Sequence, residues 1–423
     1  QWVKEINQKF GLEPVIFRSS SISKLRRQTP TNENPLHYYP IQVVSIDYMK
    51  SAKNSSHFIE ECPELVIVDE AHTCSNGKGT GRQQRHDLVK AIAKKKNQHL
   101  VLLSATPHSG KPEQFQSILA FLNTDYAELK LNNASQIQKE NLAKQFVQRR
   151  RADIQKWVSK FSREETPFPE RTHYEVSYSH SEDYLKIQFE ILKLARKIAT
   201  KDEAKEVRKN LNYWTALGLI RGVMSSPKMG SAMLEKRAKS LNDDEAEEIG
   251  AIDNPIIGDD FSMADDSSPS FLLSAAKINN DQWKKLKELA ESLKTIANSN
   301  KDQKVKKLIE LVKMWTEEGL NPIIYCRYIN TAKYVGEHLG NTFGKKSGFG
   351  VLTITSEDPD ELRKQKVEGM DKYAHRILVA TDCMSEGINL QENFTAVVHY
   401  DLPWNPNRLE QREGRVDRFG QNA

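Results

Sequence analysis

The sequence predicts an α/β protein that has two α/β domains with a helical segment between them. In residues 1–151 and again in 301–423, short apolar runs alternate with polar or helix-favouring stretches. This alternation is typical of parallel sheets covered by helices. Residues 152–300 are highly charged and favour helices outside an acidic stretch at 242–270. A chain of 423 residues is long enough for two or three domains of ordinary size.

The first domain is expected to contain strands at residues 42–46, 65–68 and 100–103. These runs are rich in Val, Ile and Leu and are separated by polar or helix-favouring residues. Residues 65–68 and 100–103 are apolar throughout, as expected of parallel strands that are covered on both faces. We therefore predict a parallel sheet here.

The middle segment favours helices, most clearly at residues 184–209 and 283–297. Within it, residues 242–270 contain ten acidic residues and no Lys or Arg, together with Pro255, Gly258 and Pro269. Few aromatic residues accompany them. This composition is typical of a mobile loop or linker, so we expect weak order in this acidic stretch.

The second domain is expected to begin near residue 301. Apolar residues spaced three or four apart form one face of its first helix: Val305, Leu308, Ile309, Val312 and Trp315. Buried strands are then expected at residues 322–325, 351–354 and 377–380.

Composition favours a soluble, cytoplasmic protein. The chain has 38% apolar and 28% charged residues, and it lacks a run of about 18 apolar residues that could span a membrane. Its first residues lack the basic and apolar regions of a secretion signal. Cys62, Cys74, Cys326 and Cys383 lie far apart and without zinc-ligand spacing, so we expect reduced, structural thiols.

The distribution of charge bears on the partner. Net charge is +5 although the acidic stretch 242–270 contributes ten negative charges, so the rest of the chain is distinctly basic. A basic body favours a polyanion, because cationic side chains neutralise phosphates and release counterions. Scattered surface lysines have the same composition, so charge alone leaves both interpretations open.

Two adjacent carboxylates, Asp69 and Glu70, follow the apolar run 65–68. Carboxylates at the carboxyl end of a parallel strand face the crevice in which α/β sheets bind ligands. Nucleotide hydrolysis requires one carboxylate that holds Mg²⁺, usually through water, and another that polarises the attacking water. Asp-Glu pairs are also common as solvated acids at strand ends, so other motifs must decide between a catalytic site and a solvated pair.

Two more polar segments follow predicted strands. Ser104 and Thr106 come after residues 100–103, and their hydroxyls could hydrogen-bond the acidic motif, although a plain Ser/Thr turn has the same sequence. Gly387 lies in the loop after residues 377–380, and the lack of a side chain lets a phosphate or nucleotide approach its backbone closely.

The most specific segment runs from Gln411 to Gln421. Arg415 and Arg418 are three residues apart, which makes them neighbours on one face of a helix. Guanidinium groups suit bidentate contact with phosphate oxygens. An isolated pair of arginines on a surface helix is ordinarily just solvated, so the functional interpretation of Arg415 and Arg418 depends on the surrounding motifs.

In order and separation, these motifs resemble those of the SNF2-family superfamily 2 ATPases over nearly the whole chain. The matching segments are Trp2 with Glu5 (motif Ia), Val44 to Tyr48 (motif Ib), Asp69 to His72 (the DEAH box), Ser104 to Thr106 (motif III), Arg149 to Ile154, Arg363, and Gln411 to Gln421 (Q-x-x-G-R-x-x-R-x-G-Q). Residues 385–391 and 402–406 resemble the bacterial branch, which includes the RNA-polymerase-recycling ATPase and the SNF2-like helicase of DISARM phage-defence systems.

The resemblance implies two RecA-like lobes, 1–151 and 301–423, with a helical SNF2-type insertion at 152–300. It also implies ATP hydrolysis in the cleft between the lobes, with ATP and Mg²⁺ as cofactors, and translocation along double-stranded DNA. Protein partners would come from a defence system or from RNA polymerase.

The resemblance further implies a role for each matching residue. Asp69 would hold Mg²⁺, and Glu70 would act as the catalytic base and contact the ion through water. Arg415 and Arg418 would act as arginine fingers. Nucleotide contacts would come from His72, Ser104, Thr106, Gly387 and Gln411. Nucleic-acid contacts would come from Ser45, Tyr48, Arg327, Thr355 and Trp404.

One family motif lacks a match. The phosphate-binding loop G-x-x-x-x-G-K-[ST] should precede motif Ia, whereas the nearest glycine-rich segment, Gly77 to Gly81, follows the acidic motif. We expect that both ends of a longer protein are missing from this sequence. If the loop is absent from the whole protein, hydrolysis should fail and the chain would be a DNA-binding or regulatory protein without ATPase activity. A strand-separating helicase and an RNA-polymerase-associated remodeller are further alternatives, and no residue excludes RNA.

Overall fold

The computed structural model describes residues 2–19, 21–76, 80–104, 112–129, 131–161, 171–200, 206–235, 280–384, 390–403 and 406–417. Predictions for the acidic stretch 242–270 and for Thr106, Gly387, Trp404 and Arg418 lie outside these residues. The chain divides into two compact units, Gln1–Arg150 and Arg151–Ala423.

The first unit contains two pairs of parallel strands. β1 (Val15–Phe17) pairs with β2 (Gln42–Val44), and β3 (Leu65–Val68) pairs with β4 (His99–Leu102). Leu65 lies opposite His99 and Val68 opposite Leu102, so β3 and β4 end at the same edge. The predicted strand 42–46 ends early, at Val44, because the short helix α4 begins at Ile46.

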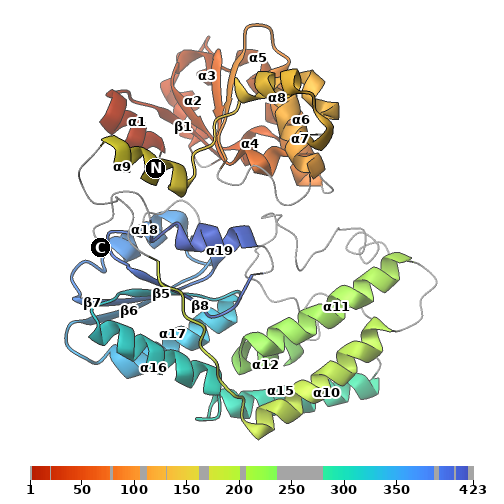
Figure 1. Cartoon of the computed structure of the whole chain (residues 1–423), viewed down its shortest axis with the longest axis vertical. Helices are drawn as coiled ribbons and strands as arrows, with labels where there is room; N and C mark the ends of the chain where they lie inside the picture. Colours follow the sequence, from red (N-terminus) through yellow and green to blue (C-terminus); the bar gives the residue numbers. More distant parts are fainter. Residues whose placement is uncertain are drawn as a thin grey trace. The chain divides into compact units, whose positions relative to one another are not determined.

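Helices surround these strands (Figure 1). They are α1 (Trp2–Phe10), α2 (Ile22–Gln28), α3 (Pro35–Tyr38), α4 (Ile46–Met49), α5 (Ala52–Glu61), α6 (Thr80–Ala93), α7 (Pro112–Leu122) and α8 (Gln136–Ala143). Short 3-10 turns complete the unit: η1 (Ala71–Cys74), η2 (Thr124–Glu128) and η3 (Leu131–Asn133). Val68, Cys74 and Phe121 belong to the apolar cluster that packs α6 and α7 beside the ends of β3 and β4.

The second unit contains a parallel sheet of strand order β6-β7-β5-β8. Its strands are β5 (Pro322–Tyr325), β6 (Phe349–Ile354), β7 (His375–Ala380) and β8 (Ala396–His399). Helices α16 (Gln303–Glu317) and α17 (Ile329–Phe343) cover one face, and α18 (Asp360–Glu368) and α19 (Pro406–Glu413) cover the other (Figure 1). Burial on both faces explains why β5 and the last four residues of β7 are apolar throughout.

Side chains alternate strictly between the two faces of this sheet. Ile324 and Val379 belong to the cluster beneath α16 and α17, whereas Ile323, Tyr325 and Leu378 belong to the opposite cluster. The apolar face predicted for α16 is confirmed: Val305, Leu308 and Val312 belong to the first of these clusters, Ile309 packs against it, and Trp315 is buried.

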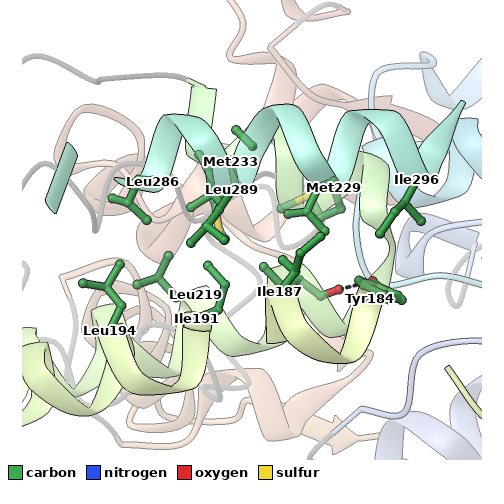
Figure 2. Packing of buried hydrophobic residues seen from close by; sticks show 14 of the residues in the cluster. Tyr184, Ile187, Ile191, Leu194, Leu219, Met229, Met233, Leu286, Leu289 and Ile296 are labelled. Atoms are coloured by element: carbon green, nitrogen blue, oxygen red, sulfur yellow. Dashed lines mark hydrogen bonds between the residues drawn. The ribbon is translucent and has the colours of Figure 1, made fainter. Parts of the chain in front are cut away.

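The segment between the two sheets is helical, as predicted. It contains α9 (Arg151–Phe161), α10 (Glu182–Ala199), α11 (Glu206–Ser225), α12 (Pro227–Glu235) and α15 (Asn280–Ala297). Figure 2 shows α10, α11, α12 and α15 packed around one apolar core, in which the Tyr184 hydroxyl donates a hydrogen bond of 2.5 Å to the carbonyl of Val223. These four helices, together termed the helical insertion below, belong to the same unit as the second sheet.

Two compositional predictions can be compared with the described residues. Among them, no helix is both long and apolar enough to cross a membrane. All four cysteines are free thiols, as predicted, and Cys62, Cys74 and Cys326 are buried.

Candidate active site

The acidic motif lies where β3 ends. Asp69 is exposed, and each of its carboxylate oxygens accepts one hydrogen bond: Oδ2 from Trp2 Nε1 at 2.8 Å and Oδ1 from the backbone N–H of Glu70 at 2.9 Å. A carboxylate offers about four lone-pair sites, so both oxygens keep acceptor capacity. The Trp2 contact orients Asp69 from 67 residues away in the chain.

Glu70 has an unusual backbone conformation. Its φ of 49° and ψ of 45° place it in the left-handed region, which residues other than glycine seldom adopt. The conformation is fixed on both sides, since Leu103 N–H donates to the carbonyl of Val68 at 2.9 Å and Ala71 N–H donates to the carbonyl of Leu103 at 2.8 Å. Such strain persists only where the surroundings enforce it, and it is concentrated at functional sites.

His72 connects the two strand ends. Its Nδ1 lies 3.2 Å from Glu70 Oε2 and 3.1 Å from Ser104 Oγ. The contact with Ser104 is a hydrogen bond whose direction depends on the tautomer of the ring, whereas the contact with Glu70 is an ion pair only when the ring is protonated. Ser104 thus contacts His72, the last residue of the DEAH box, and a direct hydrogen bond from Ser104 to Asp69 or Glu70 stays a prediction.

The donor set fits the Mg²⁺ ion that the motif implies. Within the described part of the chain, no group of three or more His, Cys, Asp or Glu side chains could hold a metal ion. Mg²⁺ is usually held by one or two carboxylates together with water and substrate phosphates, and a closed protein cage is not required. The exposed Asp69 carboxylate, with unused acceptor sites, suits that mode of binding.

A cluster of arginines surrounds Asp382, which follows β7. Arg412 Nε lies 2.6 Å from Asp382 Oδ1, and Arg408 Nη1 and Arg327 Nη1 lie 3.2 Å and 3.8 Å from Oδ2. Arg412 is fully buried and Arg408 is 4% exposed. Burial alone would raise the pKa of Asp382, but the charges and hydrogen bonds of these arginines lower it below its ordinary value. The carboxylate is therefore ionised.

Helix α19 ends at Glu413, and turns follow it at Gly414. Arg415 therefore lies in a turn, so the prediction that it shares a helical face with Arg418 was wrong for Arg415. The helix ends here because glycine is a poor helix former. Arg415 is half-buried, and its charge opposes the burial that raises the pKa of Tyr325. Gln411 is also half-buried, and its Oε1 has no hydrogen-bond partner among the described residues.

The acidic residues of the same segment pair with arginines that precede α10. Asp417 accepts from both Arg151 and Arg171, and Arg171 Nη1 also lies 3.1 Å from Glu413 Oε2. His399 Nε2 lies 3.4 Å from the other oxygen of Glu413. The two acids that flank Arg415 are thus paired with side chains of the same unit.

The residues predicted to contact nucleic acid differ in exposure. Ser45 is exposed at the start of α4, and Tyr48 is half-buried in that helix. The Arg327 side chain is 11% exposed, and Thr355 is 3% exposed. Contact between a phosphate and either of the last two side chains would require a change in this arrangement.

Sequence reasoning assigned no role to Asp382, Arg412 or Asp401. A signal was nevertheless present, because Asp382 follows β7 and Asp401 follows β8 in the way that Asp69 follows β3. The rule that selected Asp69 would also have selected these two acids. The burial of Arg412 has no comparable sequence signal, since arginine is rarely fully buried.

Comparison with known proteins identifies the family. Residues 1–209 match the model of the SNF2-related domain, and residues 303–420 match that of the helicase conserved C-terminal domain. The chain belongs to the SNF2-related family of superfamily 2 helicases. The predicted fold class, α/β with two RecA-like lobes and a helical insertion, is confirmed.

Relatives agree with this assignment. The chain is 24% identical, over its whole length, to the uncharacterized ATP-dependent helicase YqhH of Bacillus subtilis (strain 168), and it spans 62% of that protein. It is 29% identical over 29% of its length to the RNA polymerase-associated protein RapA of Sodalis glossinidius, of which it spans 12%.

A solved structure similar to the chain is the helicase domain of Pyrococcus furiosus Hef. Sequence identity is 15%, and the match covers 95% of this chain and 83% of that one. The TM-score of 0.42 lies below 0.5 and adds no weight to the assignment.

Proposed function

We propose that this chain is the motor part of an ATP-dependent translocase that moves along double-stranded DNA. The observation that carries the proposal is the edge formed by β3 and β4, where an exposed Asp69 lies next to a Glu70 held in a strained conformation. Phosphoryl transfer depends on such fixed charges, because catalysis there is mainly positioning and electrostatic stabilisation.

Each proposed role follows from the chemistry of the side chain. Asp69 would hold Mg²⁺, which neutralises phosphate charge when bound. Glu70 would accept the proton of the attacking water, and His72 would orient the Glu70 carboxylate through the 3.2 Å contact. Gln411, Arg415 and Arg418 would act on the nucleotide as in the family. Ser104 would hold His72, and Thr106 and Gly387 would contact the nucleotide directly.

DNA is the proposed polyanion because family membership and the basic composition outside residues 242–270 both favour a nucleic acid. Ser45, Tyr48, Arg327, Thr355 and Trp404 remain the proposed contacts. A role in phage defence is supported by the resemblance of residues 385–391 and 402–406 to the bacterial branch. The similarity to RapA supports RNA polymerase as an alternative partner.

The first test is ATP hydrolysis by the full-length protein with duplex DNA, single-stranded DNA, RNA or no nucleic acid. Glu70→Gln keeps the size of the side chain but removes the base, so kcat should fall by about 100-fold or more. Glu64→Gln is the matched control, because Glu64 is an exposed carboxylate at the other end of β3. Normal turnover by Glu70→Gln would remove Glu70 from the reaction.

The nucleic acid decides between the alternatives. Strong stimulation by duplex DNA, with triplex displacement and no released single strand, is the result expected of a translocase. A released strand would favour a helicase, and stimulation by RNA alone would favour an RNA remodeller. DNA binding without hydrolysis would leave a DNA-binding or regulatory protein.

A further inference from the structure

The buried carboxylate of Asp401 connects two parts of the second unit. It follows β8, its side chain is 11% exposed, and it accepts hydrogen bonds from three separate segments. Ser225 Oγ donates to Oδ2 at 2.8 Å, the backbone N–H of Arg327 donates to Oδ2 at 2.9 Å, and Lys304 Nζ lies 3.0 Å from Oδ1. Ser225 is the last residue of α11, so the helical insertion contributes one of these donors.

The backbone of Asp401 contacts α19, the helix that contains Arg408 and Arg412. The carbonyl of Asp401 accepts a hydrogen bond of 2.9 Å from Arg412 Nη1, and Arg412 is the buried arginine that binds Asp382. The side chain of Asp401 therefore faces the helical insertion, while its carbonyl faces α19. Arg327 makes a parallel connection, since its N–H binds Asp401 and its guanidinium lies 3.8 Å from Asp382.

Lys304 strengthens the contact with the helical insertion. Besides its ion pair with Asp401, its ammonium lies 3.0 Å from the carbonyl of Ser225 and 3.4 Å from that of Met224. The last carbonyls of a helix carry partial negative charge and lack partners within the helix, so a cation there is favourable. Lys304 thus binds the end of α11 and the carboxylate of Asp401 together.

Buried charges leave little freedom at this junction. Burial raises the pKa of Asp401, but the charge of Lys304 and the hydrogen bonds lower it below its ordinary value, so the side chain is ionised. An ionised carboxylate in a largely buried position needs its donors, and displacement of any one of them is costly. A shift of the corner between α11 and α12 would therefore change the position of Asp401 and, through its carbonyl, that of Arg412.

We infer that Asp401 and Ser225 are positioning residues that couple the helical insertion to the arginine segment 408–415. This inference rests on the proposed ATPase function, because the coupled segment contains the proposed arginine finger Arg415. The consequence is that the helical insertion affects the rate of hydrolysis from a distance, without touching the nucleotide.

The test compares two neighbouring serines in the full-length protein. Ser225→Ala removes the hydroxyl that binds Asp401. Ser226→Ala is the matched control, because both serines are buried and both hydroxyls contact Thr331 Oγ1, at 2.7 Å from Ser225 and 2.9 Å from Ser226. Only the Ser225 hydroxyl binds Asp401. Ser225→Thr, which keeps the hydroxyl, is the rescue variant.

Ser225→Ala should lower DNA-stimulated kcat about 5- to 10-fold, the size of effect expected when one hydrogen bond of ordinary net strength is lost, and should leave the KM for ATP unchanged. Ser226→Ala should retain kcat per folded molecule, and Ser225→Thr should recover most of it. Unchanged kcat in Ser225→Ala, or an equal loss in Ser226→Ala, would overturn the inference.

A second measurement separates the inference from the proposed function. Amide hydrogen exchange in residues 406–417 should be faster in Ser225→Ala than in Ser226→Ala, whether or not the protein hydrolyses ATP. Equal exchange in the two variants would overturn the coupling. Faster exchange in a protein that hydrolyses no ATP would leave the coupling intact and refute the ATPase function alone.

Discussion

Asp382→Asn removes the negative charge at the centre of the arginine cluster while keeping the shape of the side chain. The change leaves Arg412 and Arg408 buried beside a neutral amide. Because an amide has one oxygen and one NH₂ group, either orientation places an N–H against a guanidinium N–H, at a site where Asp382 now accepts at 2.6 Å and 3.2 Å.

The expected cost is large. Removal of one partner from a buried ion pair destabilises a protein by about 3–5 kcal/mol, since the remaining charge loses its compensation. In a unit of more than 200 residues, about 1 kcal/mol shifts the melting temperature by roughly 2 °C, so the transition of the second unit should fall by roughly 6–10 °C.

Differential scanning calorimetry of the whole chain measures this shift in melting temperature, and amide hydrogen exchange identifies the segments that lose stability. Peptides from β7 and α19 should lose protection, whereas peptides from β3 and β4 should not. Asp371→Asn is the control, because Asp371 is an exposed aspartate of the same unit. A melting temperature for Asp382→Asn within about 2 °C of this control, which corresponds to about 1 kcal/mol, would refute the argument that the charge of Asp382 holds the cluster together.

Two further predictions concern packing and pH. In Gly336→Ala, the new Cβ would lie 2.0 Å from Thr353 Oγ1, so overpacking should lower the free energy of unfolding in urea by about 1–3 kcal/mol. Adding Thr353→Ala should remove most of that cost. If the destabilisation of the double mutant equals the sum of the two single changes, the proposed clash is contradicted. Burial is the main cause that lowers the pKa of His180 below 6.5, so the unfolded chain binds its proton first and stability should fall as the pH drops below about 6.5. His180→Gln should reduce the loss of melting temperature between about pH 7.5 and 5.5, and an unchanged pH profile would contradict this sign.

The strands of the second sheet could be predicted from the sequence because both faces of that sheet are covered. In the first unit, β3 and β4 were also predicted from their apolar runs, but the expectation that both of their faces are covered was wrong, since Leu65, Ile67 and Val101 are exposed. The second sheet buries every residue of β5, so the run Pro322 to Tyr325 is apolar throughout and unmistakable. The end of α10 at Ala199, within the predicted helical stretch 184–209, could not be predicted from the sequence, because helix-favouring composition continues past that residue. Helix propensity is a weak signal, and tertiary packing decides where such a helix stops.

The acidic motif was predictable in its residues but not in its geometry. That Asp69 and Ser104 would lie near one another follows from parallel pairing of the strands before them. Neither the left-handed backbone of Glu70 nor the hydrogen bond from Trp2 follows from local sequence, because a contact fixed by packing across 67 residues leaves no local pattern.

The three strand-end acids differ in a way that sequence cannot express. Asp382 is surrounded by three arginines, and Asp401 is paired with Lys304 and accepts two further hydrogen bonds from neutral donors. These partners hold both carboxylates ionised and occupy acceptor sites on both oxygens. Asp69 has two neutral N–H donors and is exposed, so its charge is not matched by a cation within hydrogen-bonding distance among the described residues. An ionised carboxylate that keeps free acceptor sites can bind a cation from solution, whereas one that is already paired can only hold its neighbours in place. The same residue type at the same kind of strand end therefore favours metal binding at Asp69 and positioning at Asp382 and Asp401.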